Sequence, residues 1–203
     1  MRDALRAGVA VYNDGYYHAA HDAWEDRWLA LESGTDDERL LHGLIQFTAA
    51  VYHARDRNWT GAVGLAESAR EYLEGLPAAY RDVDLPPVRD YLESLASDPE
   101  VIERRSPIRL VHEGETPGLN DLDVRPTAIA AGVLAAELDF DDDPVTAAAE
   151  YAIDDLEAGR DDSRFIAVVF AFVRSDHRDV VYRRLSAHVE RRRAKEDDVE
   201  GLF

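Results

Sequence analysis

The sequence contains no cysteine among its 203 residues. This absence excludes disulfide bonds, zinc–thiolate sites, iron–sulfur clusters and thiol nucleophiles. Any metal ion that the protein binds must therefore be held by His, Asp, Glu or Gln side chains.

Long apolar runs are also missing. The longest one extends from Phe165 to Val173, whereas a helix that crosses a bilayer needs about 20 such residues. The first residues, Met1 to Ala4, do not form the basic stretch that precedes an apolar one in a secretion signal. We therefore expect a cytoplasmic protein that does not interact with a membrane.

Lysine is almost absent, because Lys195 is the only one beside 22 arginines. The chain has 42 acidic and 23 basic residues, which gives a net charge of -19. Such a surface repels phosphate backbones, so nucleic acid is not an expected partner. The acidic residues are spread between regularly spaced apolar ones, which is typical of a folded halophilic protein, and the scarcity of lysine is typical of haloarchaeal proteins.

Apolar side chains recur every three or four residues, and this spacing predicts an all-α fold. We expect a helical bundle over residues 1–103, a connector rich in Pro and Gly over 104–126, and a C-terminal helical region over 127–203. In the bundle, the expected helices cover about residues 5–12, 16–31, 36–57, 60–75 and 86–98. Thr60 is the expected N-cap of the fourth helix.

The C-terminal helical extension is expected to contain four helices, at about residues 127–138, 144–157, 164–173 and 176–193. The third is ambiguous, because its β-branched and aromatic residues also suit a buried strand. No partner strand is evident elsewhere in the sequence, so we favour a helix.

A set of ordered motifs lies in the N-terminal part of the chain: Asn13-Asp14-Gly15, Ala20-His21-Asp22, Glu25, Trp28, Gly43-Leu44-Ile45-Gln46, Tyr52-His53 and Gly61-Ala62. In kind and spacing this set resembles the domain-of-unknown-function 309 family, over about residues 5–75. The resemblance implies a compact helical bundle and the activity attached to some relatives, a metal-dependent hydrolase. It does not extend to residues 120–203.

A candidate metal site follows from the helical spacing. His21 falls on the face formed by Tyr17, Trp24 and Trp28, with Glu25 one turn further on. His42, Gln46 and His53 form a stripe on the next helix. Imidazole and carboxylate groups suit Zn, Mn, Fe or Ni. We therefore predict a divalent-metal site between the second and third helices, with the residues in these roles: metal ligands His21, Glu25 and His53, with Glu25 also the catalytic group, and a surrounding pocket of Tyr17, His18, Trp28 and Gln46.

A second hypothesis gives the same residues no catalytic role. His21 would bond to Glu25 or Gln46 in a buried polar network that holds two helices in register, and Asn13 and Asp14 would shape a turn and cap the next helix. The chain would then be a non-catalytic interaction or scaffold protein, and could be a homo-oligomer. The sequence leaves open whether the protein is an enzyme, its small-molecule substrate and the identity of a metal.

Overall fold

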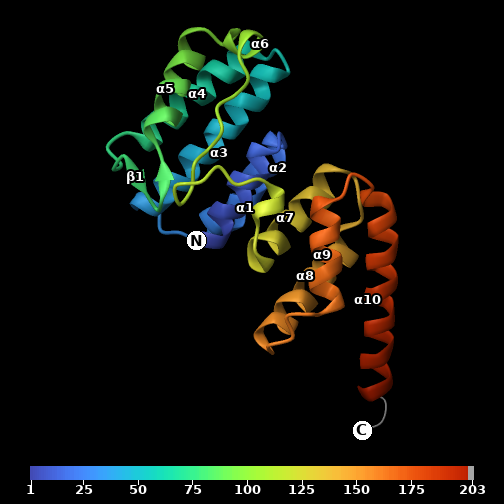
Figure 1. The fold of residues 1–203 in the computed structure, drawn as a ribbon. Helices are drawn as coiled ribbons and strands as arrows, with labels where there is room; N and C mark the ends of the chain where they lie inside the picture. The colour runs from blue at the N-terminus through green and yellow to red at the C-terminus, as the bar shows by residue number, and fades with distance from the viewer. Residues whose placement is uncertain (201–203) are drawn as a thin grey trace. The chain divides into compact units, whose positions relative to one another are not determined.

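The computed structural model describes residues 1–200 of the chain, and the side chains of residues 1–198 (Figure 1). The last three residues of the predicted C-terminal region lie outside this range. The described part is all-α, apart from one two-stranded hairpin, as the apolar spacing predicts. It divides into two compact units, residues 1–121 and the part that begins at Leu122.

The first unit is built on four helices that each pack on the next, followed by a hairpin and further short helices. Its elements are α1 (Arg2–Asn13), α2 (Tyr17–Leu29), α3 (Asp36–Arg55), α4 (Trp59–Leu73), β1 (Ala79–Tyr80), β2 (Val83–Asp84), α5 (Pro86–Ser97), α6 (Val101–Arg104) and the 3-10 helix η1 (Leu119–Asp121).

Local capping explains where α3 and α4 begin. The Thr35 side chain accepts a hydrogen bond from the Glu38 amide. Three acidic residues follow in the first turn of α3, where their negative charge interacts favourably with the helix dipole. The prediction that Thr60 caps the fourth helix is wrong. Asn58 is the N-cap, because its Oδ1 accepts a hydrogen bond from the Gly61 amide over 3.1 Å.

The short hairpin was not expected from the sequence. Arg81 and Asp82 both have positive φ angles, of 50° and 61°, and two successive left-handed residues make the tight turn that suits a two-residue hairpin loop. Ala79 pairs with Asp84, and Tyr80 with Val83. Tyr80 and Arg81 both donate to Asp37 at the start of α3, which attaches the hairpin to the bundle.

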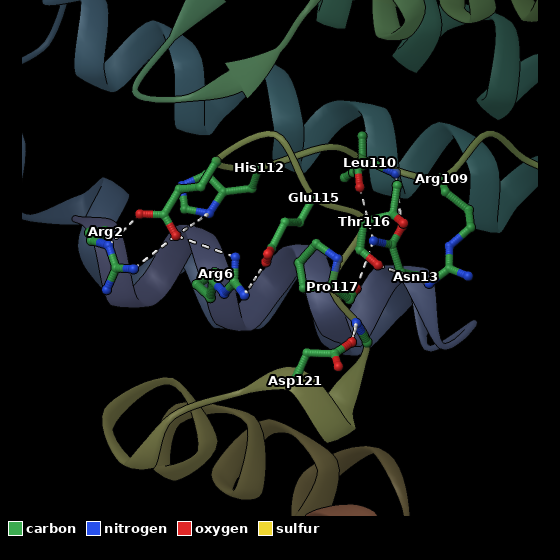
Figure 2. Close-up of polar contacts among 12 residues, drawn as sticks. Arg2, Arg6, Asn13, Arg109, Leu110, His112, Glu115, Thr116, Pro117 and Asp121 are labelled. Atoms are coloured by element: carbon green, nitrogen blue, oxygen red, sulfur yellow. Dashed lines mark hydrogen bonds and ion pairs between the residues drawn. The ribbon is translucent and has the colours of Figure 1, made fainter.

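The Asn13-Asp14-Gly15 turn holds a distant segment of the same unit, residues 108–119, which falls within the expected connector. Asn13 Nδ2 donates to the carbonyl groups of Leu110 and Pro117, over 3.0 and 2.8 Å, and Asn13 Oδ1 accepts from the Leu110 amide over 2.8 Å (Figure 2). Asp14 accepts from the Leu119 amide. The turn therefore binds the backbone of a segment about 100 positions further along the chain, in addition to joining α1 to α2.

Two arginines of α1 strengthen this attachment. Arg2 and Arg6 point from α1 toward the loop that contains His112, Glu113 and Glu115 (Figure 2). Arg6 Nη2 lies 2.8 Å from Glu115 Oε2, and the Arg6 side chain is only 12% exposed. The segment is thus attached along the length of α1. Its acidic residues form ion pairs with Arg2 and Arg6, and its backbone bonds to Asn13 at the end of the helix.

The second unit contains four helices: α7 (Val124–Glu137), α8 (Asp142–Glu157), α9 (Arg164–Arg174) and α10 (Arg178–Glu200). The ambiguous segment forms α9, a helix, as we favoured. Its apolar residues have a place in a helical core, because α9 packs against α7, α8 and α10. None of the helices described for residues 1–200 is both long and apolar enough to cross a bilayer.

Candidate functional site

The site region is organised by α2, which has one apolar face and one polar edge. Ala19, Ala20, Ala23 and Trp24 are buried. Trp24 packs directly against Gly8 of α1, where an added Cβ would lie 2.3 Å from the indole ring. This contact fixes the rotation of α2 about its axis and leaves His21 and Glu25 only partly buried, with side chains 29% and 45% exposed.

Three side chains of this edge could hold one metal ion. His21 Nε2 lies 3.7 Å from Glu25 Oε1, one helical turn away. One ligand atom from each of His21, Asp22 and Glu25 can be chosen such that all three lie within 4.8 Å of one another. It is the only such group of three or more His or carboxylate residues in the part of the chain that the structure describes.

The donor set fits a divalent transition metal. Imidazole nitrogen and carboxylate oxygen bind such ions at about 2.0–2.2 Å, so two ligand atoms on opposite sides of an ion are about 4.2 Å apart. The His21–Glu25 separation of 3.7 Å is within this limit, and the ligand atoms of all three residues lie within 4.8 Å of one another. Three protein ligands on an exposed edge leave coordination positions for water or a substrate.

His53 is not part of this group. Its Nδ1 lies 2.8 Å from Asn58 Nδ2, and Asn58 in turn caps α4. An amide nitrogen can only donate, so His53 Nδ1 accepts this bond. His53 thus helps to fix the α3–α4 connection, while Asp22 is the third residue of the group beside His21 and Glu25.

Of the predicted pocket residues His18 and Tyr17, only His18 is in contact with the group. The ring of His18 lies 5.4 Å from that of Tyr52 and 6.2 Å from that of His21, and its Nδ1 lies 4.0 Å from Asp22 Oδ2. Tyr17 makes an edge contact with Tyr12 and carries the Arg55 guanidinium over its ring. His18 therefore lies beside the Asp22 carboxylate, whereas Tyr17 contributes to packing.

Trp28 and Gln46 belong to a separate polar chain between α2, α3 and α4. Glu38 Oε1 accepts from Trp28 Nε1 over 2.8 Å and lies 3.2 Å from His42 Nδ1. Gln46 Nε2 lies 3.4 Å from His42 Nε2, and the Gly34 amide donates to the other oxygen of Glu38. If His42 carries its proton on Nδ1, it donates to Glu38 and accepts from Gln46 at Nε2, so that every hydrogen bond in this series has a donor and an acceptor.

Aromatic rings shield this second cluster. The His42 ring stacks on Tyr72 with a centroid distance of 3.8 Å and lies 4.5 Å from the Trp28 ring. The Glu38 and His42 side chains are only 11% and 17% exposed. Burial raises the pKa of Glu38, but hydrogen bonds from Trp28, Gly34 and His42 outweigh it and hold the pKa below its ordinary value of 4.5.

Glu38→Gln is expected to reduce the free energy of unfolding by about 1–3 kcal/mol near neutral pH, because it removes a buried acceptor of charge-assisted hydrogen bonds. The folded-state pKa is depressed, so this stabilisation is present above pH 4.5 and is lost as the pH falls through the folded pKa. The difference between wild type and variant should therefore shrink in acid. Urea titrations at several pH values measure it, with Asp36→Asn from the same helical turn as the control. A difference that is independent of pH would contradict the assignment.

Residues 5–65 match the model of a family described as Domain of unknown function (DUF309). This part of the chain therefore carries the domain that its motifs resemble, and the match includes most of α1, all of α2 and α3, the first part of α4 and the group of three residues on α2. No curated protein matches the chain.

Proposed function

We propose that this domain of the domain-of-unknown-function 309 family binds a divalent metal ion through His21, Asp22 and Glu25, and that the ion serves in hydrolysis. The observation that carries the proposal is the convergence of one imidazole and two carboxylates within 4.8 Å on one helix edge. The proposal keeps His21 and Glu25 from the predicted ligand set and replaces His53 by Asp22. The set still has three donors, and none of them comes from α3.

The chemistry follows from the donor set. A Zn²⁺ ion held by these residues would lower the pKa of a bound water toward about 7. His21 supplies the nitrogen ligand and Asp22 an oxygen ligand. Glu25 has two oxygens, so it can provide a ligand with one and accept a proton from water with the other. His18 Nδ1 lies 4.0 Å from Asp22 Oδ2, beside that carboxylate.

Isothermal titration of the protein, purified without an affinity tag, with Zn²⁺ or Mn²⁺ tests metal binding. We expect one ion per chain. Loss of groups that only support a ligand weakens metal sites by about 10- to 100-fold, so His21→Ala, which removes a ligand, should weaken binding at least about 100-fold. Asp22→Asn and Glu25→Gln should also weaken it, because each removes a charged oxygen donor.

His53→Ala is the matched control for this series, since it removes an imidazole from the same unit outside the ligand group. We expect unchanged affinity. A His53→Ala variant that binds as weakly as His21→Ala would contradict the ligand assignment. The hydrolytic part is tested separately, with chromogenic carboxylic and phosphoric esters: turnover by the metal-loaded protein that His21→Ala abolishes supports it, and no turnover of either class contradicts it.

A second candidate function is a non-catalytic helical interaction protein with a buried structural polar network. The satisfied chain Trp28–Glu38–His42–Gln46 favours it, because it consumes two of the residues that a catalytic pocket would need. Tyr52 favours it as well, since it is 43% exposed beside His18. Light scattering after size exclusion tests self-association; a monomer at all concentrations would count against a homo-oligomeric scaffold.

A further inference from the structure

The second unit contains a basic pocket, which is unexpected in a chain with a net charge of -19. The pocket has a volume of about 490 Å³ and lies between the start of α9 and the C-terminal half of α10. Five Arg or Lys side chains and two Asp side chains line it, together with uncharged and His residues: Asp155, Arg160, Asp162, Ser163, Arg164, Phe165, His188, Arg191, Arg192 and Lys195. It includes the only lysine of the chain.

Part of this charge is already neutralised. Arg160 Nη2 lies 2.6 Å from Asp155 Oδ1, and Arg192 Nε lies 2.5 Å from Glu196 Oε1. Asp155 also accepts a hydrogen bond from the Ser163 hydroxyl. These pairs give the pocket a fixed wall, because each charged group in them has a partner.

Three cations in the pocket have no acidic partner among the side chains that the structure describes. Within residues 1–198, Arg164, Arg191 and Lys195 form no ion pair with a carboxylate. Arg191 instead donates to His188 Nδ1 over 2.7 Å, a neutral acceptor in that geometry. The unpaired charges come from two of the elements that border the pocket, Arg164 from α9 and the other two from α10.

The local electrostatics are consistent with an excess of positive charge. The pKa of His188 is lowered by burial and then by the nearby guanidinium groups of Arg191, Arg164 and Arg184. The N-terminal end of α9, an 11-residue helix, is also at this pocket, and its dipole adds positive potential there. A further positive charge is therefore unfavourable in this pocket, and a bound anion is favourable.

We propose that this pocket binds the phosphate group of a small phosphorylated molecule, with Arg164, Arg191 and Lys195 as its contacts. Guanidinium groups bind phosphate oxygens in pairs of parallel hydrogen bonds, and a lysine adds a compact positive charge. The volume is in the range of small-molecule sites. A nucleic acid fits less well, since Asp155 and Asp162 line the same pocket and the rest of the chain is strongly acidic.

The test is a calorimetric titration of the full chain with inorganic pyrophosphate, at an ionic strength held constant with chloride. We expect saturable binding of one pyrophosphate per chain. Arg164→Gln and Arg191→Gln should each weaken it by about 10- to 100-fold, the effect of losing one charge-assisted contact. Both side chains are exposed, so the variants should fold as the wild type does. Inorganic phosphate, as a second arm, should bind at the same residues but more weakly.

Arg183→Gln is the matched control, because it removes the same charge from α10 at a position that is paired with Asp179 and lies outside the pocket. It should leave the affinity unchanged. Absence of saturable binding would overturn the proposal, and so would equal weakening by Arg183→Gln, which would show that only overall charge matters. A single-stranded RNA oligonucleotide is the last arm; tighter binding of RNA than of pyrophosphate would overturn the assignment to a small molecule.

Discussion

Trp24→Ala is expected to reduce the free energy of unfolding of the first unit by about 3–5 kcal/mol, the cost of removing a large aromatic side chain from a packed core. Trp24 is fully buried. Among the described residues its indole Nε1 has no hydrogen-bond partner, so packing alone holds the ring. Because Trp24 determines how α2 is rotated, the same variant should also weaken metal binding. Urea unfolding followed by circular dichroism measures the stability.

Gly8 provides the control for this prediction. An alanine at this position would place its Cβ 2.3 Å from the Trp24 ring, so Gly8→Ala alone should cost about 1–3 kcal/mol through overpacking. In the Trp24→Ala background, the added methyl group has space, and the same substitution should cost less or stabilise the unit. An equal cost of Gly8→Ala in both backgrounds would contradict the contact.

Asn13→Ala is expected to reduce the free energy of unfolding by about 2–4 kcal/mol, because it deletes three hydrogen bonds and leaves backbone groups without their partners. The partners are the amide and carbonyl of Leu110 and the carbonyl of Pro117, both on buried residues. Hydrogen exchange should accelerate over residues 108–119, which lose their attachment to α1. Chemical denaturation and exchange measured by mass spectrometry give the two readouts.

Asn120→Ala is the matched control for Asn13, since Asn120 is an exposed asparagine directly after the same segment, in η1. It should change the stability by less than about 0.5 kcal/mol, as exposed substitutions usually do. If both asparagine variants had the same stability and exchange, Asn13 would not hold the segment.

Apolar spacing was sufficient to predict most helices, because helices that bury one face repeat their apolar residues with the helical period. The start of α5 was predictable for another reason, because Pro86 and Pro87 suit a first helical turn. The hairpin at residues 79–84 was missed, since its turn places Arg81 and Asp82 in left-handed conformations that neither residue type signals strongly. The start of α4 was misassigned because Asn58 and Thr60 are both good N-caps.

The candidate site was only partly predictable, for a similar reason. A spacing of four residues brings His21 and Glu25 together on any helix, so the sequence is sufficient for this pair. Asp22 is adjacent to His21 in the sequence and projects about 100° away from it around the helix, so its membership depends on side-chain rotamers. The role of Glu38 was also missed: its place in the first turn of α3 indicates a stabilising charge, and only the packing of α2 on α3 brings Trp28 to it.

Asn13 shows the same limit over a longer range. The Asn13-Asp14-Gly15 sequence predicts a turn, and the chain does turn there, with Gly15 at a φ of 92°. Its second role, binding the backbone at Leu110 and Pro117, depends on a segment outside the family match. Local sequence contains no information about such a distant partner.

The most direct test of the central claim is a crystal structure of the protein soaked with Zn²⁺ or Mn²⁺, with diffraction data collected at the absorption edge of the metal. The account predicts an anomalous peak within about 2.0–2.2 Å of His21 Nε2 and of the carboxylate oxygens of Asp22 and Glu25. A metal-saturated crystal with no peak at this edge of α2, or with a peak that His53 ligates in place of Asp22, would contradict it.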